Sequence, residues 1–342
     1  MQSTRTKITT PTINHQISTI SWLLSFALLS ITVVLLGHSN IAFAEDKKLI
    51  TITEIVEHPS LEQAKRGIID VLQENNYELG RNLEIIHKNA QGAIANALLI
   101  AKQFVSLSPD AIVAISTPSA QAAIKAVSGT DIPLIFSSVT DPVAAGLVAK
   151  IDVPEANITG AIDYPLIDEE IELIQKLLPH AKTIGFLYSA GEANSVKTID
   201  LMKKAVQGKF EYIDSQIANS NQLGQAITAL VGRVDAIYIP SDNTVFSAMP
   251  KLIQMSRKHK IPVFSSDPDS VEQGVLACIG YTQYEVGRTA GQLLVRVLAG
   301  ERNIAIQKPQ IAQIFINKDS ADIMGIDPPE ELLGIKTNIV VK

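Results

Sequence analysis

Hydroxyl side chains at the start of an expected helix are the first candidates for binding chemistry. Residues 112–123 pass from an apolar, β-branched run through a polar turn into an alanine-rich segment that we expect to be helical. Thr117 and Ser119 carry hydroxyls in this turn, and the first amides of the helix, around Ala120, have no acceptor within the helix. Free N–H groups, the positive end of the helix dipole and nearby hydroxyls suit a carboxylate or a phosphate. The alternative is that Ser119 only caps the helix.

Carboxylates at the ends of expected strands offer the opposite charge. Asp242, with Asn243 after it, could pair with a ligand ammonium, or it could cap the helix that follows. Asp141 precedes a proline and could cap a turn or hold it near a junction between lobes. Asp267 precedes Pro268, where turn chemistry alone would explain an acid. An α-amino acid is the smallest common ligand that needs both an anion site and a cation site, and charge-assisted hydrogen bonds would hold both of its charges.

Other polar residues near strand ends complete the candidate set, but no catalytic motif joins them. His58, preceded by Glu57, follows the first expected strand where a cleft could use it, although a solvated loop is the alternative. Ser189 with Asn194 could reach a ligand or simply start a helix. The sequence has no G-x-S-x-G, no G-x-x-x-x-G-K-[ST], no G-x-G-x-x-G and no histidines at metal-ligand spacing. We therefore expect no enzyme activity, no metal and no cofactor.

The framework that must position these residues is an alternation of strands and helices. In the first half, β-branched runs predict strands at 49–53, 83–87, 110–116 and 133–138, with helices between them. Ser60 and Gln63 form a capping-box pattern, so the first helix is expected to begin at Ser60. Strands alternating with helices of this length predict a parallel sheet with helices on both faces.

The second half repeats the pattern. Strands are expected at 183–188, 210–213, 235–240 and 262–266, and helices at 169–178, 194–206, 221–231 and 245–259. Residues 110–117 (DAIVAIST) match 235–242 (DAIYIPSD), and 132–138 (IPLIFSS) match 261–266 (IPVFSS) in the same order. We therefore expect an α/β protein with two doubly wound parallel-sheet lobes. Because ligands lie beyond the carboxyl ends of such strands, the turns at 116–121 and 241–245 would line one cleft if the lobes face each other.

The elements after residue 275 lie outside the repeat. A helix at 284–298, a strand at 311–316 and a helical turn at 319–324 follow. Their simplest use is to cross between the lobes and form a multi-strand hinge. The expected domains are residues 48–160 plus 282–312 for lobe 1, and 161–281 plus 313–342 for lobe 2.

The N-terminal segment has the features of an export signal. Arg5 and Lys7 precede an apolar run at 22–36, and Ala42-Phe-Ala44 forms a small-residue cleavage site. We expect residues 1–44 to be a signal peptide cleaved after Ala44, with an uncleaved membrane anchor as the alternative. Removing this segment leaves 27 basic and 35 acidic residues, a balance that argues against nucleic acid as a partner. Cys278 is the only cysteine, so no intrachain disulfide forms and no cysteine follows the apolar run to accept a lipid.

Seven motifs follow one another along the chain: residues 55–61 (IVEHPSL), 115–121 (ISTPSAQ), 139–143 (VTDPV), 157–160 (NITG), 183–189 (TIGFLYS) with Asn194-Ser195, 234–244 (VDAIYIPSDNT) and 325–329 (GIDPP). In this order they resemble one family, the ABC-transporter substrate-binding proteins related to the tryptophan- and tyrosine-binding lipoproteins of Gram-positive bacteria. The resemblance covers essentially all of residues 48–342, and this sequence departs from those relatives in lacking the lipid-acceptor cysteine.

The resemblance implies a type I periplasmic-binding-protein fold with three hinge crossings and closure of two lobes on a small ligand. By analogy with amino-acid binders of this fold, Thr117, Ser119 and the Ala120 amide match a carboxylate cradle. Asp242 with Asn243 matches the amine side of the ligand. Four further motif positions are expected to face the cleft, namely Thr140, Asp141, Ser189 and Asn194.

These observations together predict the solute-binding component of an ABC importer. We expect a monomer in the periplasm that captures an amino acid, with aromatic amino acids among the candidates, and delivers it to an ABC permease in the inner membrane. One alternative is a ligand-sensing protein of the same fold that is coupled to a membrane receptor. An exported hydrolase is a more remote alternative, because the catalytic motifs are missing.

Overall fold

The computed structural model describes residues 4, 6–7, 47–155, 157–334 and 338–340, without the side chains of 333, 334 and 338–340. The expected signal peptide and its cleavage site after Ala44 fall outside these residues. Residues 47–342 form one compact unit that holds two β-sheets. In the described part of the chain, no helix combines the length and apolarity needed to span a membrane.

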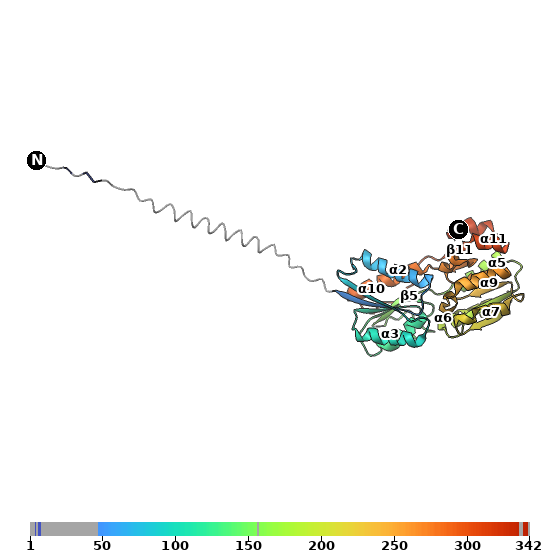
Figure 1. Cartoon of the computed structure of the whole chain (residues 1–342), viewed down its shortest axis with the longest axis horizontal. Coiled ribbons are helices and arrows are strands. Elements are labelled where there is room, and N and C mark those ends of the chain that lie inside the picture. Colours follow the sequence, from blue (N-terminus) through green and yellow to red (C-terminus); the bar gives the residue numbers. More distant parts are fainter. Residues whose placement is uncertain (1–3, 5, 8–46, 156, 335–337, 341–342) are drawn as a thin grey trace. The chain divides into compact units, whose positions relative to one another are not determined.

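The first sheet has five parallel strands in the order β2-β1-β3-β4-β5. Helices α2 (Pro59–Glu74) and α10 (Gln283–Leu298) pack against each other over one face, and α3 (Ile94–Ser106) and α4 (Thr117–Val127) cover the other (Figure 1). The strands are β1 (Lys48–Glu54), β2 (Leu83–Asn89), β3 (Ala111–Ile115), β4 (Leu134–Val139) and β5 (Ile158–Ile162).

Helices α2 and α10 approach closely because glycines lie at their contact. A Cβ atom added to Gly287 would collide with the backbone of Ala64, and one added to Gly67 would collide with the backbone of Tyr284. This contact holds α10 on the first sheet, although α10 follows a strand of the second sheet in the sequence.

The second sheet has seven strands in the order β12-β11-β10-β9-β8-β6-β7. All neighbouring strands are parallel except β10 and β11. The strands are β6 (Thr183–Ser189), β7 (Glu211–Ile217), β8 (Ala236–Ile239), β9 (Val263–Ser265), β10 (Ala277–Gly280), β11 (Gln313–Asn317) and β12 (Asn338–Val340). The helices are α5 (Ile167–Leu177), α6 (Ala193–Ala205), α7 (Leu223–Leu230), α8 (Asn243–Phe246), α9 (Met249–His259), α11 (Lys318–Met324) and α12 (Glu330–Gly334), with 3-10 turns at Ser220–Gln222 and Pro268–Gln273.

The internal repeat is confirmed by the topology. Strands β7-β6-β8-β9-β10 have the same connectivity as β2-β1-β3-β4-β5, so the two matched sequence pairs occupy equivalent strands, β3 with β8 and β4 with β9. The expectation of two doubly wound parallel-sheet lobes is therefore correct. The sequence patterns do not predict β5, β10 or β12, and β10 belongs to the repeat although it follows residue 275.

Two helix starts differ from expectation. Helix α2 begins at Pro59 with His58 at the N-cap position, so Ser60 does not cap it and its hydroxyl is left buried without a hydrogen bond of standard geometry. The helix expected at 245–259 is divided into α8 and α9, with Pro250 at the start of α9. Proline is favoured at a first helical turn and disfavoured in a helix interior, which explains the break.

The chain passes between the sheets three times, after β5, after β10 and before β11. The last passage runs beside the first: the Gln307 amide donates to the Gly160 carbonyl at 3.0 Å, and the Ile162 amide donates to the Gln307 carbonyl at 2.9 Å. These backbone bonds tie two crossings into one short ribbon.

Candidate functional site

Two cavities lie between residues of the two sheets, at the carboxyl ends of their strands. The larger, which we call the chamber, has a volume of about 310 Å³, and the smaller, the deep cavity, about 20 Å³. Asn243 lines both, so the cavities adjoin at this side chain. The chamber is lined by Ile55, Val56, Gln91, Gly92, Ile94, Pro118, Ser189, Gly191, Glu192, Ala218, Asn219, Ser220, Asn243, Thr244 and Ser247. The deep cavity is lined by His58, Ser60, Leu61, Ser116, Ser138, Thr140, Asp163, Asn194, Ser241, Asn243, Phe246, Asp267 and Gln283.

Gln283 connects the crossings at the deep cavity. Its Nε2 donates to Asp163 at 2.9 Å, its Oε1 accepts from the Ser138 hydroxyl at 2.6 Å, and its amide donates to Asp269 at 2.7 Å. Asp163 follows β5 and Asp269 lies in the 3-10 turn after β9, so the side chain and the backbone N–H of this one residue together join both sheets. The sequence patterns miss Asp163 because they miss the strand that it follows, and they give no signal for Gln283.

Asp267 is buried and its carboxylate Oδ1 accepts the Asp269 amide at 2.9 Å, as an N-cap of the 3-10 turn. Burial raises the pKa of Asp267 well above its ordinary value, and the neighbouring Asp269 raises it further. Burial likewise raises the pKa of Asp163, and that of Asp269 to about 6. Within the described residues, none of these three carboxylates forms an ion pair.

His58 reaches across the cleft, while Glu57 does not. The Nε2 atom of His58 lies 3.3 Å from Oδ1 of Asn243, and its ring packs edge-on against Phe246 with centroids 5.5 Å apart. Burial lowers the pKa of His58, which favours the neutral imidazole. Glu57 is exposed and lines neither cavity, because its side chain leaves the strand end on the solvent side. The structure therefore does not bring Glu57 together with the other expected site residues.

Glu192 is a buried carboxylate that the sequence patterns did not single out. It accepts from the Asn243 amide and Nδ2 at 3.1 and 2.6 Å, and from the Thr244 amide and hydroxyl at 2.8 and 2.7 Å. Asn194 adds a further donor at 3.2 Å. Since Nδ2 of Asn243 must face this carboxylate, Oδ1 of Asn243 faces His58. Glu192 therefore positions the side chain that meets the opposite lobe.

The carboxylate of Asp242 is occupied by donors from its own lobe. It accepts from the Ser189 amide and the Ser195 hydroxyl, both at 2.6 Å, and it caps α8 through the Val245 amide at 2.8 Å. It lines neither cavity. Burial and the neighbouring Glu192 raise the pKa of Asp242 to about 8, while the three donors act in the opposite direction. Of the two interpretations of Asp242, the geometry favours the helix cap over the ammonium partner.

The expected anion cradle lies next to the cleft, but some of its hydrogen-bonding groups already have partners within the protein. Ser116, at the deep cavity, is the N-cap residue of α4, and Pro118 lines the chamber. The Ala120 amide donates to the Ser116 carbonyl at 3.0 Å, so it is engaged, and the Ser119 hydroxyl lies 3.4 Å from that of Ser116. The Thr117 hydroxyl is buried and makes no hydrogen bond within the described chain.

The remaining motif residues lie at three places in the cleft. Thr140 and Asn194 line the deep cavity, and Ser189 lines the chamber. Asn194 donates to the Ser241 carbonyl at 2.7 Å, and its Oδ1 is buried without a partner. Asp141 accepts the Val143 and Ala144 amides, and its second oxygen pairs with Lys197 of α6 at 3.0 Å. Asp141 thus forms an ion pair between the lobes and lines neither cavity.

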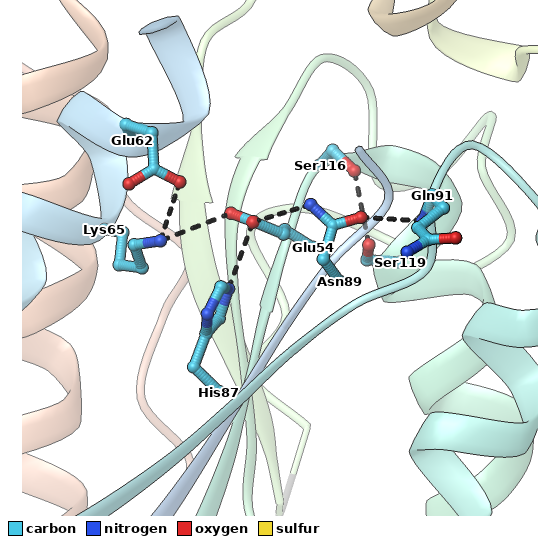
Figure 2. Close-up of polar contacts among 8 residues, drawn as sticks. All are labelled: Glu54, Glu62, Lys65, His87, Asn89, Gln91, Ser116 and Ser119. Atoms are coloured by element: carbon cyan, nitrogen blue, oxygen red, sulfur yellow. Dashed lines mark hydrogen bonds and ion pairs between the residues drawn. The ribbon is translucent and has the colours of Figure 1, made fainter. Parts of the chain in front are cut away.

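A buried acid belongs to a polar network that reaches a residue of the chamber, and Figure 2 shows the contacts of this network. Glu54, at the end of β1, lies 3.1 Å from His87 and accepts from Asn89 at 2.9 Å. Burial alone would raise the pKa of Glu54, but His87 and Lys65 hold it below its ordinary value. Asn89 in turn accepts the amide of Gln91, which lines the chamber. The network therefore fixes the turn after β2 against the cleft. In the part of the chain that the structure describes, no group of acids, histidines or cysteines is arranged to hold a metal ion.

Comparison with known proteins identifies relatives over most of the chain. The family model described as ABC transporter substrate binding protein matches residues 49–340. The chain is 41% identical over 280 residues to the tyrosine-binding protein of Clostridioides difficile, and the match covers 81% of each chain.

Two solved structures differ in ligand state. An ABC domain from Streptococcus pneumoniae in complex with L-Trp matches with a TM-score of 0.82 at 31% identity, covering 87% of this chain and 100% of that one. The ligand-free, open structure of a substrate-binding protein with adhesive properties from Clostridium difficile matches with a TM-score of 0.65 at 36% identity, covering 86% and 99%. This chain therefore superposes better on the L-Trp complex than on the ligand-free, open structure, although it is more identical in sequence to the latter.

Proposed function

The chain belongs to the ABC transporter substrate-binding protein family, and from that premise we propose that it captures an amino acid between its lobes and delivers it to an ABC permease. The observation that carries the proposal is the cleft itself, in which a polar deep cavity adjoins a chamber large enough for a small ligand. The amino acid follows from the relatives, one named for tyrosine and one solved with L-Trp.

The chamber has the mixed lining that an aromatic amino acid requires. Ile55, Val56 and Ile94 contribute apolar surface from one lobe, and Asn219, Ser220 and Ser247 contribute polar groups from the other. Such a lining accommodates a ring with a polar edge, which supports an aromatic amino acid over a sugar or a charged side chain.

Closure around this ligand supplies the conformational change that a binding component needs. A ligand shifts the lobes only if it binds the closed state better than the open one, and contacts from both lobes provide that difference. Cleft residues from both lobes, including His58 and Asn243, already meet in this structure.

Calorimetry against the twenty amino acids tests the proposal, with protein that has been unfolded and refolded to remove any bound ligand. We expect an aromatic amino acid to bind with Kd near 1 μM, about −8 kcal/mol. Binding of none of the twenty would overturn the amino-acid assignment. Binding of sugars alone would also overturn the amino-acid assignment.

The cellular setting is part of the proposal. We infer export through the N-terminal segment, cleavage after Ala44, a periplasmic location and a monomeric state. N-terminal sequencing of the secreted protein tests the cleavage site, and light scattering tests the monomer. Loss of amino-acid uptake in a deletion strain would support transport, whereas intact uptake with a lost response to the amino acid would favour a receptor-coupled sensor.

A further inference from the structure

We propose that the deep cavity is an ammonium subsite, in which Asp163 and Asp267 bind the amino group of the ligand while the rest of the ligand occupies the chamber. This inference rests on the proposed function and assigns the amino group to residues near the hinge crossings instead of Asp242. It is carried by four features of the cavity: its charge, its unpartnered atoms, its size and its position.

The acids of the cavity have no counter-ion in the part of the chain that the structure describes. Asp163 and Asp267 both line it, Asp269 lies directly behind Asp267, and no ion pair to any of them forms among the described residues. A buried carboxylate without a counter-ion is costly, so a cationic ligand group gains more here than at a carboxylate already saturated by donors. Asp242 and Glu192 are saturated in this way.

The unpartnered atoms in the cavity are acceptors. Asn194 directs its Nδ2 toward the Ser241 carbonyl, which leaves Oδ1 as a buried acceptor without a partner. His58 faces the Oδ1 acceptor of Asn243 through Nε2, so in the neutral ring Nε2 carries the proton and Nδ1 is an unpartnered acceptor. Asp163 Oδ1 makes no hydrogen bond of standard geometry, although Thr140 lies close enough to lower its pKa.

These three buried acceptors, one of which belongs to Asp163, together with the second acid, Asp267, require a ligand group that donates several hydrogen bonds and carries positive charge. A primary ammonium has three donors and no acceptor, which matches this set. Both Asn194 and His58 are at least nine-tenths buried, with 4% and 5% of their surface exposed, so solvent does not replace the missing donors. The Ser60 hydroxyl lies near Asp267 and can accept or donate.

Size and position select an ammonium over a guanidinium. A volume of about 20 Å³ holds one water-sized group, and an ammonium is of that size. The chamber begins at Asn243, which lines both cavities, so a ligand with its amino group in the deep cavity extends past this side chain into the chamber.

The test separates the two charges of the ligand. Calorimetry compares the amino acid found in the screen with its decarboxylated amine and its des-amino acid; for tyrosine these are tyramine and 3-(4-hydroxyphenyl)propionate. The proteins are the wild type, Asp267→Asn, Asp163→Asn and the control Asp214→Asn, whose carboxylate pairs with Lys203 on lobe 2 outside both cavities. Thermal unfolding checks that each variant folds. If Asp267→Asn does not fold, Asp163→Asn carries the test.

We expect each site variant to weaken the amino acid and the amine at least about 30-fold and the des-amino acid less than about threefold. Asp214→Asn should change none of the three. In the wild type at pH 6, calorimetry in two buffers of different ionisation enthalpy should show protons released on binding of the amine, because the ammonium displaces protons from the acids, and none on binding of the des-amino acid.

The outcomes distinguish the two proposals. Suppose that the wild type binds an amino acid. If both site variants bind it with unchanged affinity, or lose as much affinity for the des-amino acid as for the amino acid, the ammonium subsite is wrong and the proposed function stands. If the wild type binds the amine but no amino acid, the subsite stands and the amino-acid assignment fails. Binding of neither overturns both.

Discussion

At the scale of single residues, hydrogen-bond saturation distinguishes structural acids from ligand-binding ones. Asp242 has two backbone amides and one hydroxyl as donors, whereas Asp163 has an oxygen with no partner of standard geometry. Both residues are aspartates, so residue type alone does not distinguish them. Their surroundings in the fold assign Asp242 to the stability of lobe 2 and Asp163 to the cavity.

Asp242→Asn should therefore lower the stability of the protein and leave its ligand selectivity nearly unchanged. The amide keeps one acceptor but places a donor against donors, which should reduce the free energy of unfolding by about 2 kcal/mol, measured by urea denaturation. The affinity ratio of the amino acid to its des-amino analogue should stay within about threefold of the wild-type ratio. A selective loss of the amino acid with unchanged stability would return Asp242 to the amine role.

Thr117 tests the carboxylate end of the ligand. Its hydroxyl is buried without a partner at the start of α4, so Thr117→Val removes a polar group that the free protein does not use. We expect the amino acid and its des-amino analogue to bind about 10-fold more weakly and the amine to bind as before, measured by calorimetry.

Thr51→Val is the matched control, because the Thr51 hydroxyl is also buried without a partner but lies in β1, whereas Thr117 lies between Ser116 and Pro118, which line the two cavities. It should leave all three affinities unchanged. Equal effects of the two substitutions would show that α4 contributes no carboxylate contact.

At the scale of elements, α6 of lobe 2 is joined to the turn after β4 of lobe 1 by one ion pair. Asp141 caps its own turn with Oδ1 and presents Oδ2 to Lys197, whose pKa is raised chiefly by this hydrogen bond. Because the partners are on different lobes, the pair exists only when the lobes are close, and it stabilises the closed state alone.

Lys197→Gln should weaken ligand binding about two- to fivefold, since a partly exposed ion pair contributes up to about 1 kcal/mol. A double-mutant cycle with Asp141→Asn, read by calorimetry, should give a coupling of this size that shrinks in 0.5 M salt. Lys203→Gln, which removes an ion pair within lobe 2, is the control and should not change affinity. Zero coupling between Asp141 and Lys197 would show that their ion pair does not stabilise the closed state.

At the scale of the whole molecule, the acids near the hinge make stability depend on pH. The direction of the pKa shift is clearest for Asp269. Burial raises its pKa to about 6, Glu272 adds to the increase, and the hydrogen bond from the backbone N–H of Gln283 opposes it. The folded state then holds a proton that the unfolded state has released between about pH 4 and 6. Stability from this group is present below pH 4 and is lost as the pH rises through 6.

We therefore expect the free energy of unfolding of the ligand-free protein to decrease between about pH 4 and 6, with a contribution of about 3 kcal/mol from this group at most. Asp269→Asn should flatten the profile in urea titrations across this range. Bound ligand should oppose the decrease, because an ammonium stabilises the ionised acids. An unchanged slope in Asp269→Asn would show that this carboxyl is not the source.

Local patterns in the sequence determined a large part of this molecule. Alternating β-branched runs and helical periodicities, repeated in two halves, predicted the paired parallel sheets and the strand ends where the cleft lies. His58, Asn194, Asn243 and Asp267 were singled out from their positions near strand ends, and Thr140 from the family resemblance; all five line the deep cavity.

Only the tertiary structure decided which polar groups are free. Ser60 does not cap α2, because this helix begins at Pro59. Asp163 lies at the cleft because it follows a strand that the sequence patterns miss. The carboxylate of Asp242 is saturated by hydrogen bonds that include donors far from it in the sequence. Hydrogen-bond partners and burial arise from contacts between distant segments, and residue type and spacing do not contain them.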